Sequence, residues 1–328
     1  MNKILKKTLK ILLPILLGAF ILYWVYRDFD FRQAAGVLSH GIDWGWMSAS
    51  LFFGVMSHVF RGWRWKQTLE PLGEHPRSSH CVDAIFLSYA ANLVLPRVGE
   101  VSRCGVLSRY DGVSFAKSLG TVVTERLIDT LCICLITGLT FLAQMPVFFT
   151  FFRETGTKIP SLLHLVTSPW FYVSLFCVVG VGVLLYFLLR MLSFFEQVKG
   201  IVLHVWEGVV SLRRVRNLPL FLFYTLAIWA CYFLHFYLPF FCFSFTSHLS
   251  FLAGLVLFVG GTFAVIVPTP NGAGPWHFAV ITMMMLYGVS ATDSAIFALI
   301  VHAIQTLLVI LLGLWAMLHL QGERRDTN

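Results

Sequence analysis

Two stretches of the chain combine helix-breaking residues with groups that can bind an anion. The first, LPRVGEVSR followed by TERLID, contains six charged side chains: Arg97, Glu100, Arg103, Glu125, Arg126 and Asp129. An arginine can hold a phosphate through two parallel N–H bonds, and a carboxylate can orient an arginine or accept an ammonium group. A charge at mid-bilayer costs ~2.5–3.5 kcal/mol on insertion scales, so these groups should face other helices. The pattern predicts either a phosphate site or a structural ion-pair network.

The second stretch is VPTPNGAGPWHF, which lies inside an apolar run, residues 217–292, without any Lys, Arg, Asp or Glu. A broken helix leaves backbone N–H groups without intrahelical partners. Asn271, Gly272 and Gly274 can turn such groups toward one point, and a helix starting near Pro275 adds the positive end of its dipole. We therefore expect this break to cradle an anionic head group, with a tight helix connection as the alternative.

Two histidines accompany the second break. His277 lies within it, and His302 lies in the apolar run that follows. Imidazoles can hydrogen-bond a head group or titrate near neutrality. A histidine whose hydrogen bonds are satisfied by neighbouring helices is the alternative interpretation for both.

The composition excludes a soluble protein. The 328 residues are 58% hydrophobic and 12% charged, with a mean hydropathy of +0.78, whereas soluble domains carry about 25% charged residues. The apolar runs are continuous, so the ~10-residue alternating segments of a membrane β-barrel are not present. The net charge of +8 comes from basic residues at the ends of apolar runs, which is typical of the positive-inside rule rather than of nucleic-acid binding.

The elements that must position these groups are transmembrane helices. We predict an all-α polytopic membrane protein with about eight such helices, two short broken or re-entrant elements and an amphipathic interfacial helix at about 196–216. The long spans are expected at about 9–26, 44–60, 118–147, 170–192, 218–244, 250–267 and 294–320, and the short elements at 81–95 and 276–287. Together they form one integral membrane domain, residues 1–328.

The two breaks occupy matching places in two halves of the chain, about 81–147 and 250–320. Each break is followed by a short element, then Gly-Val-Ser, then a long helix. Gly288 follows Gly112 by 176 residues, and His302 follows Arg126 by the same interval. Paired breaks in repeated halves are a sequence pointer to a transporter site, with a coincidental match as the alternative.

The distribution of Lys and Arg predicts the topology. It places both termini, the loop at 61–77 and the loop at 190–216 in the cytoplasm. We therefore expect a multi-pass protein of the cytoplasmic (inner) membrane.

No pattern of a known catalytic or cofactor site is present. The sequence lacks G-x-S-x-G, a Walker A loop and a dinucleotide fingerprint, its histidines lack metal-ligand spacing, and its seven cysteines include no C-x-x-C pair. We expect no catalytic residue, no cofactor, no metal and no nucleic-acid partner. Whether the protein is an enzyme stays open.

With its paired motifs, the chain resembles the lysylphosphatidylglycerol synthase transmembrane (flippase-like) family over nearly its whole length. The resemblance implies a membrane domain that moves a modified lipid between leaflets, here without the soluble aminoacyl-transferase domain of the two-part members. Members usually have a Pro-Gly-Gly-x-Gly break, a glutamate shortly after it and an arginine in the next helix. Asn271, His277 and His302 stand at those positions, so head-group preference or proton coupling can differ.

Three functions stay open at this point. The first is translocation of an anionic or aminoacylated phospholipid, or of a polyprenyl-phosphate-linked lipid. The second is a membrane-embedded enzyme subunit, or a partner of a separate lipid head-group transferase. The third is a structural or regulatory membrane protein.

Overall fold

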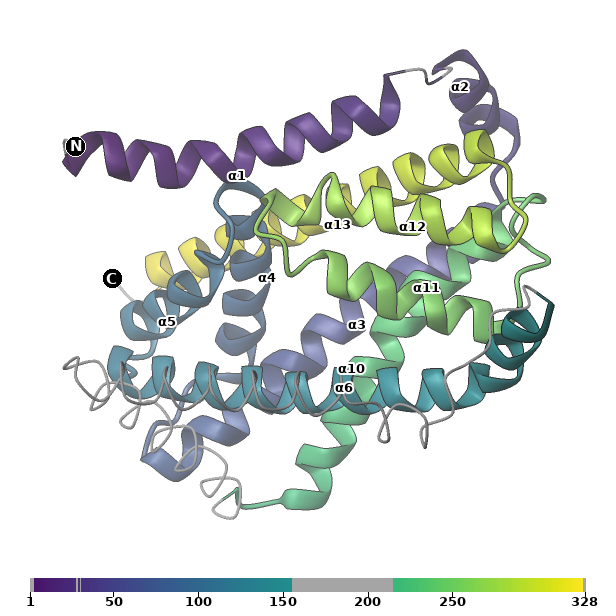
Figure 1. Ribbon diagram of the computed structural model, residues 1–328. Coiled ribbons are helices and arrows are strands. Elements are labelled where there is room, and N and C mark those ends of the chain that lie inside the picture. Colours follow the sequence, from purple (N-terminus) through teal and green to yellow (C-terminus); the bar gives the residue numbers. More distant parts are fainter. Residues whose placement is uncertain (1–2, 28, 30, 155–214, 327–328) are drawn as a thin grey trace, which may run out of the picture.

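The computed structural model describes residues 3–27, 29, 31–154 and 215–326 and contains no strand in those ranges (Figure 1). The predicted all-helical architecture is confirmed there. Within these ranges, three short 3₁₀ turns lie at Glu70–Leu72 (η1), Leu238–Cys242 (η3) and Pro270–Gly272 (η4). The α-helices are α1 (Lys3–Tyr26), α2 (Phe31–His40), α3 (Trp44–Leu69), α4 (Ser78–Val94), α5 (Gly99–Tyr110), α6 (Phe115–Glu154), α10 (Leu218–Tyr237), α11 (Phe251–Ala264), α12 (Pro275–Leu286) and α13 (Ala291–Asp326).

Three segments of the described chain are long and apolar enough to cross a bilayer: Phe115–Met145, Leu218–Cys242 and Ala291–Glu323. Two shorter apolar helices are Leu12–Tyr26 and Phe251–Ala264. These segments define a multi-pass membrane protein. The count of about eight spans stays a prediction, since the expected span at 170–192 and the amphipathic helix at 196–216 lie outside the described residues.

Side-chain caps fix where several of these helices begin. Asp43 Oδ1 accepts the Gly45 N–H at 2.8 Å before α3, and Asn217 Oδ1 accepts the Leu220 N–H at 3.1 Å before α10. Ser250 Oγ accepts the Ala253 N–H at 3.2 Å before α11. Each cap satisfies one of the N–H groups that a helix start leaves unpaired, so each long apolar run has a defined start.

Helix α3 differs from the prediction in its length. We expected a span that ends near Phe60, with the basic residues after it in a cytoplasmic loop. The helix instead continues to Leu69, and Arg61 and Arg64 are buried within it. Burial is possible because these arginines face acidic groups of α6, which neutralise them inside the protein.

The helices pack around a central pair formed by α3 and α10. Helix α4 packs against α3, α5 and α13, while α11 packs against α6 and α12. Helix α1 packs on α12 and η4, and Figure 1 shows α1 along the side of the molecule that carries α12 and α13. The first half of the described chain therefore contacts the second half along several helix pairs, among them α3 with α10, α4 with α13, and α6 with α11.

Helix α5 folds back onto α4 through a close backbone contact. Gly99, the first residue of α5, donates its N–H to Asn92 Oδ1 at 2.9 Å. A Cβ at Gly99 would overlap the carbonyl oxygen of Ser88. A residue without a side chain is therefore required where α5 meets α4.

The two predicted halves have matching elements. Helices α5 and α12 each have 12 residues, and the turns after them contain Gly112 at φ 67° and Gly288 at φ 86°. Among the described residues, the two non-glycine residues with positive φ are Arg97 and Asn271, one in each break. The repeat stays a prediction, and these correspondences are its structural support.

The first turn of α1 and the last turn of α13 lie at the same end of the molecule, on the left in Figure 1. At this end, Glu323 of α13 contacts two residues beside the start of α4. Its Oε2 lies 2.6 Å from Arg77 Nη1 and 2.8 Å from His80 Nε2. The side of the membrane on which this end lies stays a prediction.

Candidate functional site

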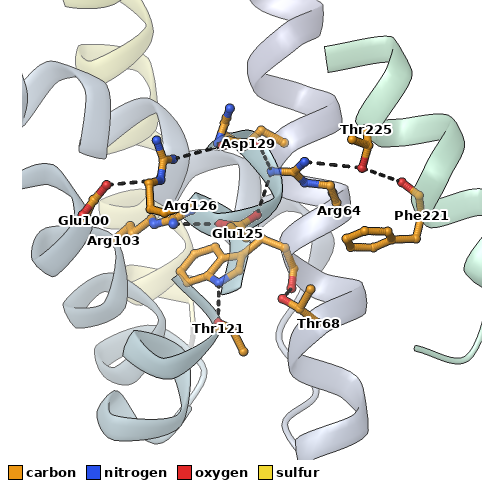
Figure 2. Close-up of polar contacts among 12 residues, drawn as sticks. Arg64, Thr68, Glu100, Arg103, Thr121, Glu125, Arg126, Asp129, Phe221 and Thr225 are labelled. Atoms are coloured by element: carbon orange, nitrogen blue, oxygen red, sulfur yellow. Dashed lines mark hydrogen bonds and ion pairs between the residues drawn. The ribbon is translucent and has the colours of Figure 1, made fainter. Parts of the chain in front are cut away.

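A network of charged side chains connects α3, α5 and α6 (Figure 2). Two members come from α3, two from α5 and three from α6. Their order along the chain is Arg61, Arg64, Glu100, Arg103, Glu125, Arg126 and Asp129. The structure thus brings together five of the sequence-predicted site residues and adds two arginines of α3.

Asp129 is the carboxylate with the most cationic neighbours in this network. Its Oδ2 accepts from Arg61 Nη1 at 2.8 Å, and its Oδ1 accepts from Arg64 Nη2 at 2.8 Å. Arg126 Nη2 lies 3.7 Å from Oδ2. Asp129 therefore links the two arginines of α3 to α6.

Glu125 is fully buried one turn earlier on α6. Its Oε2 lies 2.7 Å from Arg103 Nη2, and its Oε1 lies 3.6 Å from Arg64 Nη2. The Arg103 guanidinium also lies over the Trp65 ring, 4.5 Å from the ring centroid. Neither oxygen of Glu125 and no nitrogen of Arg103 has an aligned hydrogen bond to a described residue. The Arg103–Glu125 pair is therefore held by electrostatic attraction. Its nitrogen and oxygen atoms keep hydrogen-bonding capacity that a ligand or water could use.

The network opens to the surroundings at Arg126 and Glu100. Arg126 Nε lies 3.2 Å from Glu100 Oε1, and the two side chains are 43% and 35% exposed. Arg64 and Glu125, by contrast, are completely buried. The network therefore extends from an accessible end to a closed interior.

The network has an excess of positive charge. Its four arginines face three carboxylates. The resulting net charge of one favours an anion, and the low dielectric of the interior strengthens that preference. The same contacts also serve a structural ion-pair network, so geometry alone does not separate the two roles.

Polar side chains continue the network between α3 and α10. Arg61 Nε donates to Tyr232 Oη at 3.0 Å, and Tyr232 Oη lies 2.5 Å from Tyr89 Oη of α4. Arg64 Nη1 donates to Thr225 Oγ1 at 3.4 Å (Figure 2). The charges thus contact both halves of the protein.

The N–H groups of the second break are used within the break. Gly272 N donates to Thr269 O at 3.2 Å, and Ala273 N donates to Pro270 O at 2.9 Å. Gly274 N donates to His277 Nδ1 at 3.4 Å. A Cβ at Gly274 would lie 2.8 Å from the Gly18 carbonyl oxygen of α1. The expected cradle therefore lies under α1 with these donors already paired.

His277 and His302 lie side by side, with ring centroids 4.5 Å apart. His302 Nε2 must carry a proton, because it lies 3.2 Å from the carbonyl oxygen of Asn271. Asn271 Nδ2 donates to Thr306 Oγ1 at 2.8 Å, and Thr306 Oγ1 lies 3.4 Å from His302 Nδ1. These hydrogen bonds connect the second break to α13.

Arg97 connects the two breaks. Its exposed Nη2 donates to the carbonyl oxygen of Ile266 at 3.3 Å. The eleven predicted site residues therefore form two clusters with Arg97 between them. One holds the charged residues of α5 and α6, and the other holds Asn271, Gly272, Gly274, His277 and His302. Their role as substrate-binding residues stays a prediction.

Arg61 and Arg64 are the network members that sequence reasoning missed. They follow an apolar run and are close to Lys66, so they were assigned to the cytoplasmic end of a span. A signal was nevertheless present. Ser57, Arg61, Arg64 and Thr68 recur every three or four residues, which places polar groups on one helix face.

In the described part of the chain, no three His, Cys, Asp or Glu side chains are grouped so that they could hold a metal ion.

The fold and this network define a polytopic helical membrane protein with a buried charged site between its helices. The chain belongs to the lysylphosphatidylglycerol synthase transmembrane family: the family described as "Lysylphosphatidylglycerol synthase TM region" matches residues 11–313. A curated relative is "Glycosyltransferase AglD" of Haloferax volcanii, 29% identical over 93 residues. That match covers 28% of this chain and 15% of the relative's length. No solved structure matches the chain.

Proposed function

We propose that the protein translocates an anionic or aminoacylated phospholipid, or a polyprenyl-phosphate-linked lipid, across the cytoplasmic membrane. The observation that carries this proposal is the buried network with one more arginine than carboxylates. Family membership supports a lipid-related role in the membrane. A net positive site between helices suits a head group that has lost its water and retains its phosphate.

The accessible end of the network would receive the phosphate. Arg126 is the exposed arginine of the network, and its side chain pairs with the carboxylates of Glu100 and Asp129. A phosphate oxygen can replace a carboxylate oxygen on Arg126 without leaving the guanidinium unpaired. Such an exchange keeps Arg126 paired while the head group enters, and the partly exposed Glu100 carboxylate that it releases can bind water.

The buried end would hold the head group during crossing. Arg103 has nitrogens without aligned hydrogen bonds, and Glu125 beside it has free acceptor capacity. The Arg103 guanidinium suits a phosphate, and the Glu125 carboxylate suits the ammonium group of an aminoacylated lipid. The acyl chains would remain in the bilayer throughout, since only the head group needs a polar environment.

A second candidate is a membrane partner of a lipid head-group transferase. The match to a protein named as a glycosyltransferase favours it, although that match covers a small part of the relative. Affinity purification of the full chain from its own membranes tests this candidate. Recovery of a transferase in fixed ratio would support it.

The decisive experiment is head-group flipping in proteoliposomes. Fluorescent phosphatidylglycerol, phosphatidylethanolamine and a polyprenyl phosphate are tested in turn with wild-type protein, Arg126→Gln and a matched control, Lys117→Gln. Lys117 is an exposed cation that pairs with Glu74 away from the network. We expect flipping of at least one lipid, reduced about tenfold or more by Arg126→Gln because a charge-assisted bond is lost, and unchanged in the control. Absence of flipping for every lipid, with and without a pH gradient, would exclude autonomous translocation of those lipids.

A further inference from the structure

A polar pocket of about 530 Å³ lies outside the charged network, where α3 ends, α4 begins and α10 begins. Its walls include Trp63, Lys66, Gln67, Ser78, Arg216 and Tyr224. A volume of this size is typical of a small-molecule site. We propose that this pocket binds the phosphodiester and attached polar group of a phospholipid in the cytoplasmic leaflet, before the head group reaches the network.

The charge of the pocket selects for a phosphate. Lys66 comes from α3 and Arg216 precedes α10, so two cations approach from different elements, and Glu70 supplies one carboxylate. Lys66 Nζ donates to Ser78 Oγ at 3.0 Å, which positions the ammonium group and leaves two of its three N–H bonds. The start of α10 at Asn217 adds the positive end of a helix dipole.

Neutral polar groups suit the part of the head group beyond the phosphate. Gln67, Ser78 and Asn217 offer amide and hydroxyl groups to the pocket. The Oε1 atom of Gln67 is buried and accepts no hydrogen bond from any described residue. An unpaired buried acceptor is costly, and a hydroxyl or ammonium group of a bound lipid would satisfy it.

Aromatic residues favour a lipid over a free anion. The rings of Trp63 and Tyr224 lie 5.9 Å apart and both line the pocket. Tryptophan and tyrosine concentrate where a protein meets the lipid head groups. Their apolar faces would contact the glycerol and the first acyl carbons, which inorganic phosphate lacks.

The pocket adjoins the network through neighbouring residues of two helices. Trp63 of the pocket precedes Arg64 of the network, and Tyr224 precedes Thr225, which Arg64 contacts at 3.4 Å. A head group in the pocket would therefore contact the same two helices, α3 and α10, that hold Arg64 and Thr225. The order pocket first, network second rests on the proposed function, whereas binding in the pocket does not.

The binding test uses the purified full chain in detergent and water-soluble dihexanoyl phosphatidylglycerol, followed by microscale thermophoresis. We expect saturable binding that weakens about tenfold or more in Lys66→Gln/Arg216→Gln and is unchanged in Lys117→Gln. Circular dichroism and gel filtration establish that the variants are folded. Inorganic phosphate serves as the second ligand and should bind much more weakly, since it lacks the glycerol and acyl groups.

The outcomes separate this inference from the proposed function. Equal lipid affinity in wild type and the double variant would overturn the pocket. Equal affinity for inorganic phosphate and lipid would overturn the lipid as its ligand. If the pocket binds as expected while flipping fails, the translocator proposal is lost and the binding site stands. If both the pocket and the translocator proposal hold, Lys66→Gln/Arg216→Gln should translocate labelled lipid at the wild-type rate when its mole fraction is high. At a low mole fraction, the variant should translocate it more slowly than the wild type.

Discussion

At the residue scale, the network depends on a few carboxylates that each serve several arginines. Asp129 pairs with both Arg61 and Arg64, which are buried on α3. Desolvated ion pairs contribute little net stability, yet removal of one partner leaves a buried charge uncompensated. The loss of a single carboxylate should therefore affect the fold more than its small net contribution to stability suggests.

Asp129→Asn should destabilise the protein by about 3–5 kcal/mol, the usual cost of breaking a buried pair. The amide keeps the shape of the side chain but removes the charge opposite two arginines. Unfolding in a mixed detergent series, followed by circular dichroism, measures the change. Glu74→Gln is the control, since it breaks a pair with the half-exposed Lys117, and it should change stability far less. Equal effects of the two variants would contradict the structural importance of Asp129.

The histidine pair offers a second prediction at this scale. The rings of His277 and His302 are 4.5 Å apart, and the family resemblance of the sequence implies a glutamate and an arginine at these two positions. His277→Glu and His302→Arg should each destabilise the fold, since each buries one unpaired charge. The double variant should recover part of the loss, with a coupling energy of about 0.5–3 kcal/mol. A double-mutant cycle of unfolding free energies measures it, and strict additivity would show that the two positions do not interact.

Some residues of the charged network could be predicted from the sequence, and others could not. Charges such as Glu125 and Arg126 stand out because they lie inside an apolar run. Arg61 and Arg64 did not stand out, because basic residues after an apolar run usually mark a membrane surface. Their burial depends on partners from α6 and α10, and the pairing of distant helices is not readable from one chain segment.

At the element scale, short helices and tight turns determine where the charges lie. Helix α5 carries Glu100 and Arg103 and is held to α4 at Gly99. The break before it includes Arg97 in a left-handed conformation, which is uncommon for a residue with a side chain. The sequence predicted both breaks from their Pro and Gly content. It did not show that α5 folds back along α4, because that contact depends on one missing Cβ.

Gly99→Ala should therefore displace α5 from α4 and weaken the fold by about 1–3 kcal/mol, as overpacking does. The new methyl group would overlap the Ser88 carbonyl oxygen. Gly105→Ala on the same helix is the matched control, because a Cβ there meets no atom within 4 Å. The control should be neutral or stabilising by up to ~1 kcal/mol through helix propensity. Thermal unfolding of both variants tests this, and a neutral Gly99→Ala would show that α5 is not fixed as described.

At the scale of the whole molecule, the two predicted halves are interleaved rather than adjacent. Helix α4 packs on α13, and α6 packs on α11, around the pair α3 and α10. A relative movement of the halves would change these contacts and the surroundings of the network together. The sequence indicated paired halves through matching breaks, but cross-packing requires contacts between residues more than 100 positions apart. The number of crossings was not readable either, because the sequence does not show whether the short elements α4 and α12 each cross the membrane or return.

The topology of the whole molecule yields the last prediction. Lys66 and Arg216 mark one end of the α3 and α10 pair, which the positive-inside rule assigns to the cytoplasm. Asp43 lies at the opposite end of α3, where its N–H donates to the Cys242 carbonyl oxygen at 3.0 Å. The turn near Ser247 follows directly and is exposed, without Lys or Arg nearby.

Alkaline phosphatase inserted after Ser247 should therefore be active, since that enzyme matures only outside the cytoplasm. The same enzyme fused after Asn328 should be inactive, whereas green fluorescent protein fused there should fluoresce. Immunoblots of the fusions correct both readouts for expression. An inactive insertion at Ser247 combined with an active fusion at Asn328 would invert the molecule in the membrane. The proposed pocket would then face the outer leaflet, and a lipid would enter the network from that side.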